Sequence, residues 1–430
     1  MITPVFWITQ SDQEISIRIR APYSKLSEVD IDYGDFQFLF SCAPYFLRLT
    51  FNQRLEFYGE TPAKMTFDSD SGEFTICVPK KVVGEEFTGL DLISNLLRPK
   101  SEVHARELVQ EVEGTSDDEE EEGDLGGDEF YVEQNVQDIE HGIQIREKNI
   151  KCYGYGFGWR RIGVVEQLAE ELSELEPLKK SIGVKIDERE AEGRKIDQDE
   201  FDVEHYLGDA LEPDDQLIQS MRADFGLKLD LTNEDRERLK DMSNKKFLRL
   251  GQEMNKKAAI SLVDIVFAYA YDLRVSDWES SCESGWTITR LSPTLGQLSR
   301  FEDVKSGLTA AVRKSLCLPL YRSYDLSMRV VEDVKKIFDA GQTALLHVLC
   351  DVHRILATSG GFRYIFNDLF ITDYCLWIQS VDVPVLDWIR EEVQNVQTIT
   401  KGEIFVDLDL DVLELDFKMH ITSVDSDDEA

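Results

Sequence analysis

Three side chains with metal-ligating chemistry lie close together in the sequence, namely His347, Cys350 and His353. They are spaced i, i+3, i+6, so on a helix the two histidines lie about 120° apart around the axis. No fourth ligand nearby would complete a tetrahedral zinc site. The spacing therefore favours a helix with a buried cysteine and flanking histidines, and we predict no metal.

Gly154, Gly156 and Gly158 form a G-x-G-x-G pattern, which lacks the G-x-G-x-x-G spacing of a dinucleotide-binding loop. The intervening Tyr155 and Phe157 would crowd a phosphate group, so we expect an aromatic loop packed on a helical domain. No Walker A, nucleophile-elbow or kinase motif occurs in the chain. We therefore predict a protein that is not an enzyme and carries no cofactor.

Carboxylates are the most abundant charged groups, with 84 Asp and Glu against 47 Lys and Arg, a formal net charge of −37. This charge disfavours direct binding to nucleic acid or to an anionic membrane, because both are polyanions. It predicts instead a basic protein partner, or simply a soluble chain with acidic tails. Ten carboxylates lie in residues 111–128 and ten more in residues 403–430. Ser116 and Ser426 precede acidic residues and are candidate phosphorylation sites.

The elements that must position these groups change character along the chain. Ile15, Ile17 and Ile19 alternate with polar residues, which is the period of a half-buried strand. Beyond the first acidic run, apolar residues recur at helical spacing. We predict a multi-domain chain: an all-β sandwich over 1–97, an acidic disordered linker over 98–149, an all-α domain over 150–400, and an acidic C-terminal strand and tail over 401–430.

The C-terminal segment from Phe405 to Phe417 alternates apolar and acidic residues, with one slip in phase. As a strand it would have one apolar face and one carboxylate face. Either the acidic face binds basic groups of a partner, or the apolar face docks on this protein's own helices and the acidic face is solvated. The candidate partner-binding carboxylates are Asp407, Asp409, Asp411, Glu414 and Asp416.

An aromatic series formed by Phe366, Phe370, Tyr374 and Trp377 follows one face of a helix. These side chains either belong to the core or form an exposed aromatic patch that binds a partner, with Tyr374 as a contact residue. If they are core, Asp368 and Asp373 are the better candidates for partner contact.

The cysteines indicate a reducing compartment, because there are 7 of them, widely spaced and without a C-x-x-C pair. The N-terminus has no signal-peptide pattern, and the most apolar stretch, residues 258–271, has the length of a buried helix. We expect a nuclear and cytoplasmic protein that is monomeric and makes no membrane contact.

Several longer blocks resemble a known family. Ala21-Pro-Tyr23 and Pro44-Tyr-Phe-Leu-Arg-Leu49 are similar to segments of the CS domain, the β-sandwich of some heat-shock co-chaperones. The order of the later blocks after a CS domain resembles the Shq1-type H/ACA ribonucleoprotein assembly chaperones. Those blocks are Tyr153–Gly158, Asp264–Asp272, Ser284–Ile288, Pro319–Arg322 and Phe366–Gln379.

The resemblance implies a non-catalytic factor for H/ACA particles, which serve ribosome and telomerase biogenesis. Such proteins bind the pseudouridine synthase dyskerin before RNA arrives, and their helical domain occupies its RNA-binding surface. Acidic side chains would then stand in for RNA phosphates. The alternatives are a generic acidic holdase and a co-chaperone adaptor that works through its CS domain.

Overall fold

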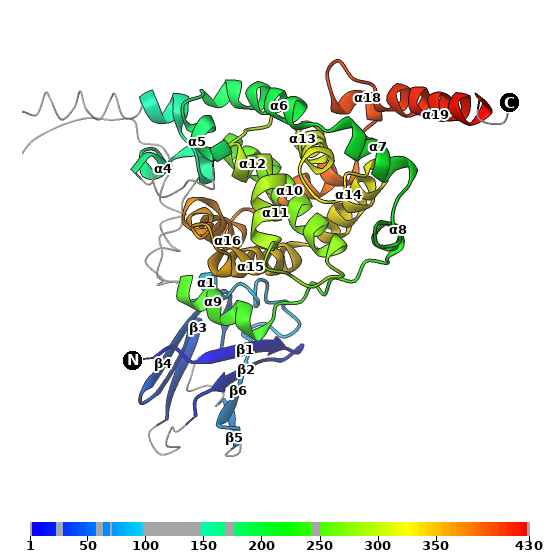
Figure 1. Cartoon of the computed structure of the whole chain (residues 1–430). Coiled ribbons are helices and arrows are strands. Elements are labelled where there is room, and N and C mark those ends of the chain that lie inside the picture. The colour runs from blue at the N-terminus through cyan, green and yellow to red at the C-terminus, as the bar shows by residue number, and fades with distance from the viewer. Residues whose placement is uncertain are drawn as a thin grey trace, which may run out of the picture. The chain divides into compact units, whose positions relative to one another are not determined.

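The computed structural model describes residues 2–22, 29–56, 63–68, 71–97, 148–167, 176–242 and 250–427. The chain forms two compact units, Met1–Thr88 with Leu96–Asn149, and Gly89–Asn95 with Ile150–Ala430. The first unit holds the strands and the second holds most of the helices (Figure 1). Residues 98–147 of the predicted linker, including Ser116, lie outside the described residues.

The first unit consists of two antiparallel sheets. One sheet has the order β1 (Val5–Gln10), β2 (Glu14–Arg20), β6 (Glu73–Pro79), β5 (Lys64–Asp68). The other pairs β3 (Asp30–Cys42) with β4 (Tyr45–Leu55). Phe40 on β3 and Phe74 on β6 are both fully buried, and their ring centroids lie 5.3 Å apart, so side chains of the two sheets meet in one core. The alternating Ile15, Ile17 and Ile19 are fully buried, which confirms the predicted sandwich.

A short segment that follows the strands packs with the helical unit. Ser94 is fully buried there; its backbone N–H donates to Gln379 Oε1 (2.9 Å) and its hydroxyl donates to the Leu239 carbonyl (2.7 Å). Asp91 forms an ion pair with Arg236 at 2.9 Å. The sequence assigned residues 1–97 to the sandwich, whereas the packing places Gly89–Asn95, including the start of α1 (Ile93–Leu96), with the helices.

Helix α10 (Gln252–Val275) runs through the middle of the helical unit (Figure 1). It packs against α11 (Ser284–Leu291), α13 (Val304–Cys317), α14 (Tyr324–Asp339) and α17 (Val383–Gln394). Every residue from Ala258 to Arg274 is buried, so the predicted buried helix over this stretch is confirmed.

Several polar side chains of α10, including Asp264 and Arg274, have partners on the neighbouring elements. Asp264 accepts from the Ser292 hydroxyl (2.6 Å) and from the Thr294 backbone N–H (3.1 Å), at the start of α12 (Pro293–Gly296). Burial raises the pKa of Asp264 to about 7. Arg274 Nε lies 2.5 Å from Asp333 Oδ2 on α14, and both side chains are almost fully buried.

Further elements of the helical unit surround α10. They are η3 (Phe157–Trp159), α4 (Val164–Gln167), α5 (Glu176–Ile182), η5 (Ile186–Glu188), α6 (Arg189–Glu200), α7 (Val203–Leu211), α8 (Asp215–Arg222), α9 (Asn233–Met242), α15 (Gln342–Thr358), η6 (Asn367–Ile371) and α16 (Thr372–Ile378).

No single helix among the described residues is long and apolar enough to cross a membrane. Two helices bent by 111°, Asn367–Ile378 and Val383–Gln394, pass that test only as a pair.

The glycine-rich loop is a packing element, as predicted. Tyr155 and Phe157 are almost fully buried. A Cβ at Gly154 would lie 2.2 Å from the Trp159 carbonyl oxygen, so only glycine fits there. The buried Arg189 guanidinium donates to the carbonyls of Tyr153 and Gly154, both at 2.7 Å, which ties the loop to α6.

The predicted C-terminal strand is wrong, because residues 401–404 and 410–427 are helical, in α18 (Lys401–Ile404) and α19 (Leu410–Asp427). Asp409 begins α19, since its Oδ1 accepts the Asp411 N–H at 2.9 Å. The slip in phase places Leu410, Leu413 and Phe417 at i, i+3, i+7, which is helical spacing. Local capping and that spacing together favour a helix over an isolated strand.

Replacing Arg274 with Met should destabilise the helical unit by about 3–5 kcal/mol, because Asp333 would keep a buried charge without its main partner. The double variant Arg274→Met/Asp333→Leu should lose clearly less, since it buries no unpaired charge. Urea unfolding followed by tryptophan fluorescence measures both. If the losses measured for Arg274→Met and for Asp333→Leu alone simply add in the double variant, the buried pair is not coupled in this way.

Candidate partner-binding site

The aromatic series belongs to the core. Phe366, Phe370, Tyr374 and Trp377 are each at most 4% exposed. The Tyr374 hydroxyl donates to the Ala258 carbonyl at 3.0 Å, and its ring lies 4.8 Å from that of Phe157. Tyr374 is therefore an internal residue rather than a partner contact, because its ring and its hydroxyl are both used inside the protein.

The two acidic residues of the same block have different surroundings. Asp368 is exposed, and Asp373 is half-buried with its Oδ2 3.1 Å from Arg161 Nη2. The Asp373 pair links α16 to the chain that follows the glycine-rich loop. Asp368 is thus the more accessible of the two candidate contacts.

His347 from the sequence motif is used internally. Its Nδ1 lies 2.7 Å from Asp235 Oδ2, and Asp235 also accepts from the Thr232 N–H and hydroxyl in a cap of α9. Burial acts to lower the pKa of His347, but the hydrogen bond with Asp235 and the negative charges of Asp235, Asp351 and Asp230 together outweigh it, so the pKa is raised. Within the described residues, no three His, Cys, Asp or Glu side chains converge as metal ligands do.

The C-terminal arm, defined here as residues 395–427, is anchored on the helical unit at α18. The Ile404 carbonyl accepts from Arg313 Nε at 2.6 Å. The Phe405 ring lies 4.4 Å from that of Phe201, and Ile404 and Phe405 are both buried. This part of the arm docks on the protein's own helices, which was one of the two alternatives that the sequence left open for the segment from Phe405 to Phe417.

Glu414 holds α19 against α7 and α18. Its Oε1 accepts from the Tyr206 hydroxyl and from Lys401 Nζ, each at 2.6 Å, and only 13% of its side chain is exposed. Burial and this carboxylate together raise the pKa of Tyr206 well above its usual value. Lys401 also lies 3.3 Å from Asp411. Glu414 is therefore an anchor within the arm rather than an accessible contact.

The other four candidate carboxylates of the arm are exposed. Asp409 caps α19 through the Asp411 N–H, and Asp411 remains 72% exposed beside Lys401. Asp407 and Asp416 form no ion pair with any described side chain. The structure thus leaves Asp407, Asp411 and Asp416 as the carboxylates that a partner could reach.

An apolar stripe on α19 lies between two of these carboxylates. Val412, Leu415 and Met419 are 53%, 56% and 55% exposed and are spaced i, i+3, i+7. At 100° per residue, Asp411 and Asp416 border this stripe on opposite sides. We call these five residues the outer face of α19. Interpreting the segment as a strand hid this face, although its helical spacing is visible in the sequence.

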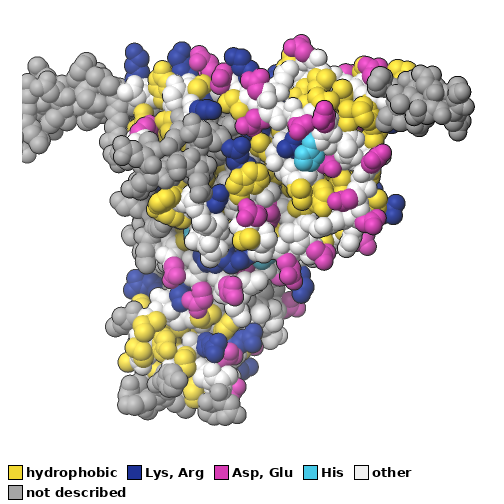
Figure 2. Space-filling view, viewed as in Figure 1, with side chains coloured by type: hydrophobic (Ala, Val, Ile, Leu, Met, Phe, Trp, Pro, Cys, Tyr) yellow, Lys and Arg dark blue, Asp and Glu magenta, His cyan; other side chains and the backbone are white. Residues whose placement is uncertain are grey.

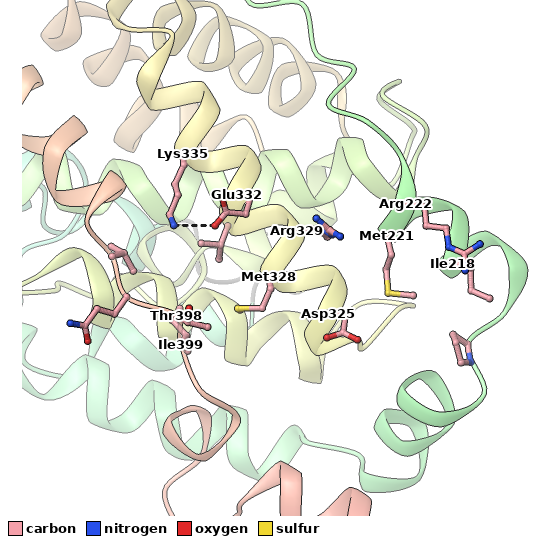
Figure 3. Close-up of a pocket in the computed structure, with 14 residues that line it drawn as sticks. Ile218, Met221, Arg222, Asp325, Met328, Arg329, Glu332, Lys335, Thr398 and Ile399 are labelled. Atoms are coloured by element: carbon pink, nitrogen blue, oxygen red, sulfur yellow. Dashed lines mark hydrogen bonds and ion pairs between the residues drawn. The ribbon is translucent and has the colours of Figure 1, made fainter.

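A separate cavity of about 620 Å³ lies between α8, α14 and residues 396–399 (Figure 3). Met221 and Met328 line it, and Arg222 and Arg329 lie at its exposed edge. Carboxylates line it as well, including Glu332, which pairs with Lys335 at 3.0 Å. Charges of both signs are present, so the electrostatics of this cavity select neither an anion nor a cation.

Replacing Lys401 with Met should loosen α19, because Glu414 would lose its cation while staying largely buried. Amide hydrogen exchange of residues 410–419 should accelerate by about tenfold, which corresponds to about 1.4 kcal/mol of local stability. Lys335→Met, which removes a similarly accessible lysine whose carboxylate partner Glu332 is 56% exposed, is the matched control. Unchanged exchange in Lys401→Met would show that this ion pair does not hold the helix.

Comparison with known proteins bears on both units. Residues 221–408 match the family described as SHQ1 protein, Shq1 domain, and residues 3–97 match the SHQ1-like CS domain. Helix α19 begins just beyond the first match.

Similar proteins extend over the whole chain. Protein SHQ1 homolog of Caenorhabditis elegans is 43% identical over 435 residues, which cover 100% of this chain and 99% of that protein. The mouse (Mus musculus) Protein SHQ1 homolog is 33% identical over 95% of this chain and 74% of its own length. Protein shq1 of Schizosaccharomyces pombe is 28% identical over 100% of this chain and 99% of its own. With both domains matched in order and a full-length relative at this identity, the chain belongs to the SHQ1 family.

Proposed function

We propose that this protein is a non-catalytic assembly chaperone for H/ACA ribonucleoproteins. It binds a dyskerin-type pseudouridine synthase before RNA is loaded, and it occupies the RNA-binding surface of that enzyme as an acidic placeholder. Membership of the SHQ1 family supports the assembly role. The outer face of α19 is the observation that supports the placeholder mechanism.

The chemistry of the outer face fits a surface built for RNA. Such a surface presents Lys and Arg to phosphates, and exposed carboxylates can pair with the same cations. Val412, Leu415 and Met419 add apolar area between Asp411 and Asp416, which would exclude water from the charge pairs at their edges. Helix α19 lies at the periphery of the helical unit, with its C-terminal end pointing away from the other helices (Figure 1).

Net charge acts at longer range. On the face shown in Figure 2, acidic side chains are scattered among basic and apolar ones rather than gathered in one patch. A net charge of −37 nevertheless attracts a basic protein and speeds its encounter with this chain. Attraction of this kind does not choose between basic partners, so specificity must come from a defined contact such as α19.

The proposal includes the cellular setting expected from the sequence. The protein acts as a monomer in the nucleus and cytoplasm, and it contacts neither nucleic acid nor a membrane directly. The wide spacing of the cysteines supports a reducing compartment, and the acidic composition disfavours direct contact with the polyanionic surfaces of nucleic acid and membranes.

The variant Asp407→Asn/Asp411→Asn/Asp416→Asn tests the placeholder mechanism. Its affinity for the purified pseudouridine synthase should fall by about tenfold, since three partly exposed ion pairs contribute about 1–2 kcal/mol in total. The salt dependence of binding should also become shallower. Titration calorimetry at several salt concentrations measures both effects, and an H/ACA guide RNA should displace the wild-type protein.

A matched control removes three exposed carboxylates at and along α17, in Asp382→Asn/Glu391→Gln/Glu392→Gln. This control should stay within about twofold of wild type, because it changes net charge equally and leaves α19 intact. Equal weakening of both triple variants would instead identify a generic acidic holdase. Binding that depends on residues 2–88 and not on α19 would identify a CS-domain adaptor.

A further inference from the structure

Three of the sequence blocks that resemble the family meet at one hollow. Tyr271 comes from Asp264–Asp272, Trp286 from Ser284–Ile288, and Leu320 from Pro319–Arg322, and all three line a cavity of about 390 Å³. The end of α10, the start of α11 and the chain after α13 build its walls. We call this the aromatic hollow.

The walls of the aromatic hollow are suited to an apolar side chain. Tyr271 and Tyr321 are largely buried, and the Tyr271 hydroxyl donates to the Tyr321 carbonyl, so this polar group is already paired. The Leu320 side chain is 73% exposed at the hollow, while its backbone is fixed by a hydrogen bond between its carbonyl oxygen and His205 Nε2 (2.8 Å). A large apolar side chain kept in solvent beside an apolar hollow is typical of a docking surface.

A second hollow of about 370 Å³ continues the first, because the two share Gln216 and Val275. Asp215 and Asp277 line this second hollow, and Glu283 lines the aromatic one. All three carboxylates are exposed, and none forms an ion pair with a described side chain.

Among the described residues that line the two hollows, the only cation, Arg274, is already neutralised. Arg274 lines the second hollow, but its Nε pairs with Asp333 and its Nη1 donates to the carbonyls of Ser220 (2.7 Å) and Ala223 (2.9 Å). The groove formed by the two hollows therefore has a mainly apolar end, the aromatic hollow, and a polar end with carboxylates that form no ion pair with a described side chain. It lies on α8, α10, α11 and the chain after α13, and none of the α19 side chains that the structure describes lines it.

We propose that this groove binds an extended segment of a partner protein that carries a large apolar residue next to Lys or Arg. The apolar side chain enters the aromatic hollow beside Leu320 and Trp286. The neighbouring cation lies over Asp215 and Asp277, which form no ion pair with any side chain in the described part of the chain. The groove is a second docking surface, independent of the placeholder function of α19.

Short random peptides displayed on phage and selected on the full-length protein provide the test. The enriched peptides should share one large apolar residue flanked by Lys or Arg. A labelled synthetic copy of the strongest one is then titrated by fluorescence anisotropy. Its Kd should rise by about tenfold for Leu320→Asp and by about threefold for Asp215→Asn/Asp277→Asn, the latter with weaker salt dependence.

Matched controls lie on α17 and its cap. Val383→Asp alters another exposed apolar residue, 63% exposed, and Asp382→Asn/Glu391→Gln removes two exposed carboxylates; both should leave the Kd unchanged. The substituted groove residues are exposed, so circular dichroism should show unaltered folding. Failure to enrich peptides, enrichment without basic residues, or equal binding by Leu320→Asp and Val383→Asp would each overturn the proposal.

Discussion

Helix α10 imposes the constraint on which the helical unit depends. It is buried over more than four turns, so each polar side chain along it needs a partner on another element. Asp264 forms a hydrogen bond with Ser292 at the start of α12, Tyr269 with Asp351 on α15, and Arg274 with Asp333 on α14. These contacts favour the observed neighbours of α10, because displacing α12, α14 or α15 would leave one of these buried polar groups unpaired.

The family-like blocks fall into two spatial groups around this helix. The glycine-rich loop and the Phe366–Gln379 block pack on each other through Phe157, Tyr374 and Trp377. These residues therefore stabilise the core of the domain. The other three blocks meet where α10 ends, and there the packing leaves an apolar hollow open to solvent. Resemblance in sequence therefore covers both core and surface, and only the fold separates the residues that support the domain from those that a partner can reach.

The C-terminal arm shows how one segment combines both roles. Glu414 and Phe405 attach it to the helical unit, while the outer face of α19 points to solvent. Five carboxylates that look equivalent in sequence thus become one anchor, one helix cap and three accessible charges. Of the carboxylates in the arm, only a few can therefore make a defined contact with a partner. The total charge of the chain, by contrast, attracts basic partners in general.

The sequence by itself determined the class of each domain, because apolar periodicity reports which faces must be buried: Ile15, Ile17 and Ile19 on a strand, and Ala258–Tyr271 on a buried helix. It also placed Tyr155 and Phe157 in a packed loop. Tertiary structure alone decided that Tyr374 is internal, that Glu414 is an anchor, that Gly89–Asn95 packs with the helices, and that three distant blocks form one groove. The C-terminal segment was misassigned because alternation with one slip fits a strand and a helix alike. Periodicity describes a residue's own element, whereas exposure and pairing depend on residues far away in the chain, such as Tyr206 for Glu414.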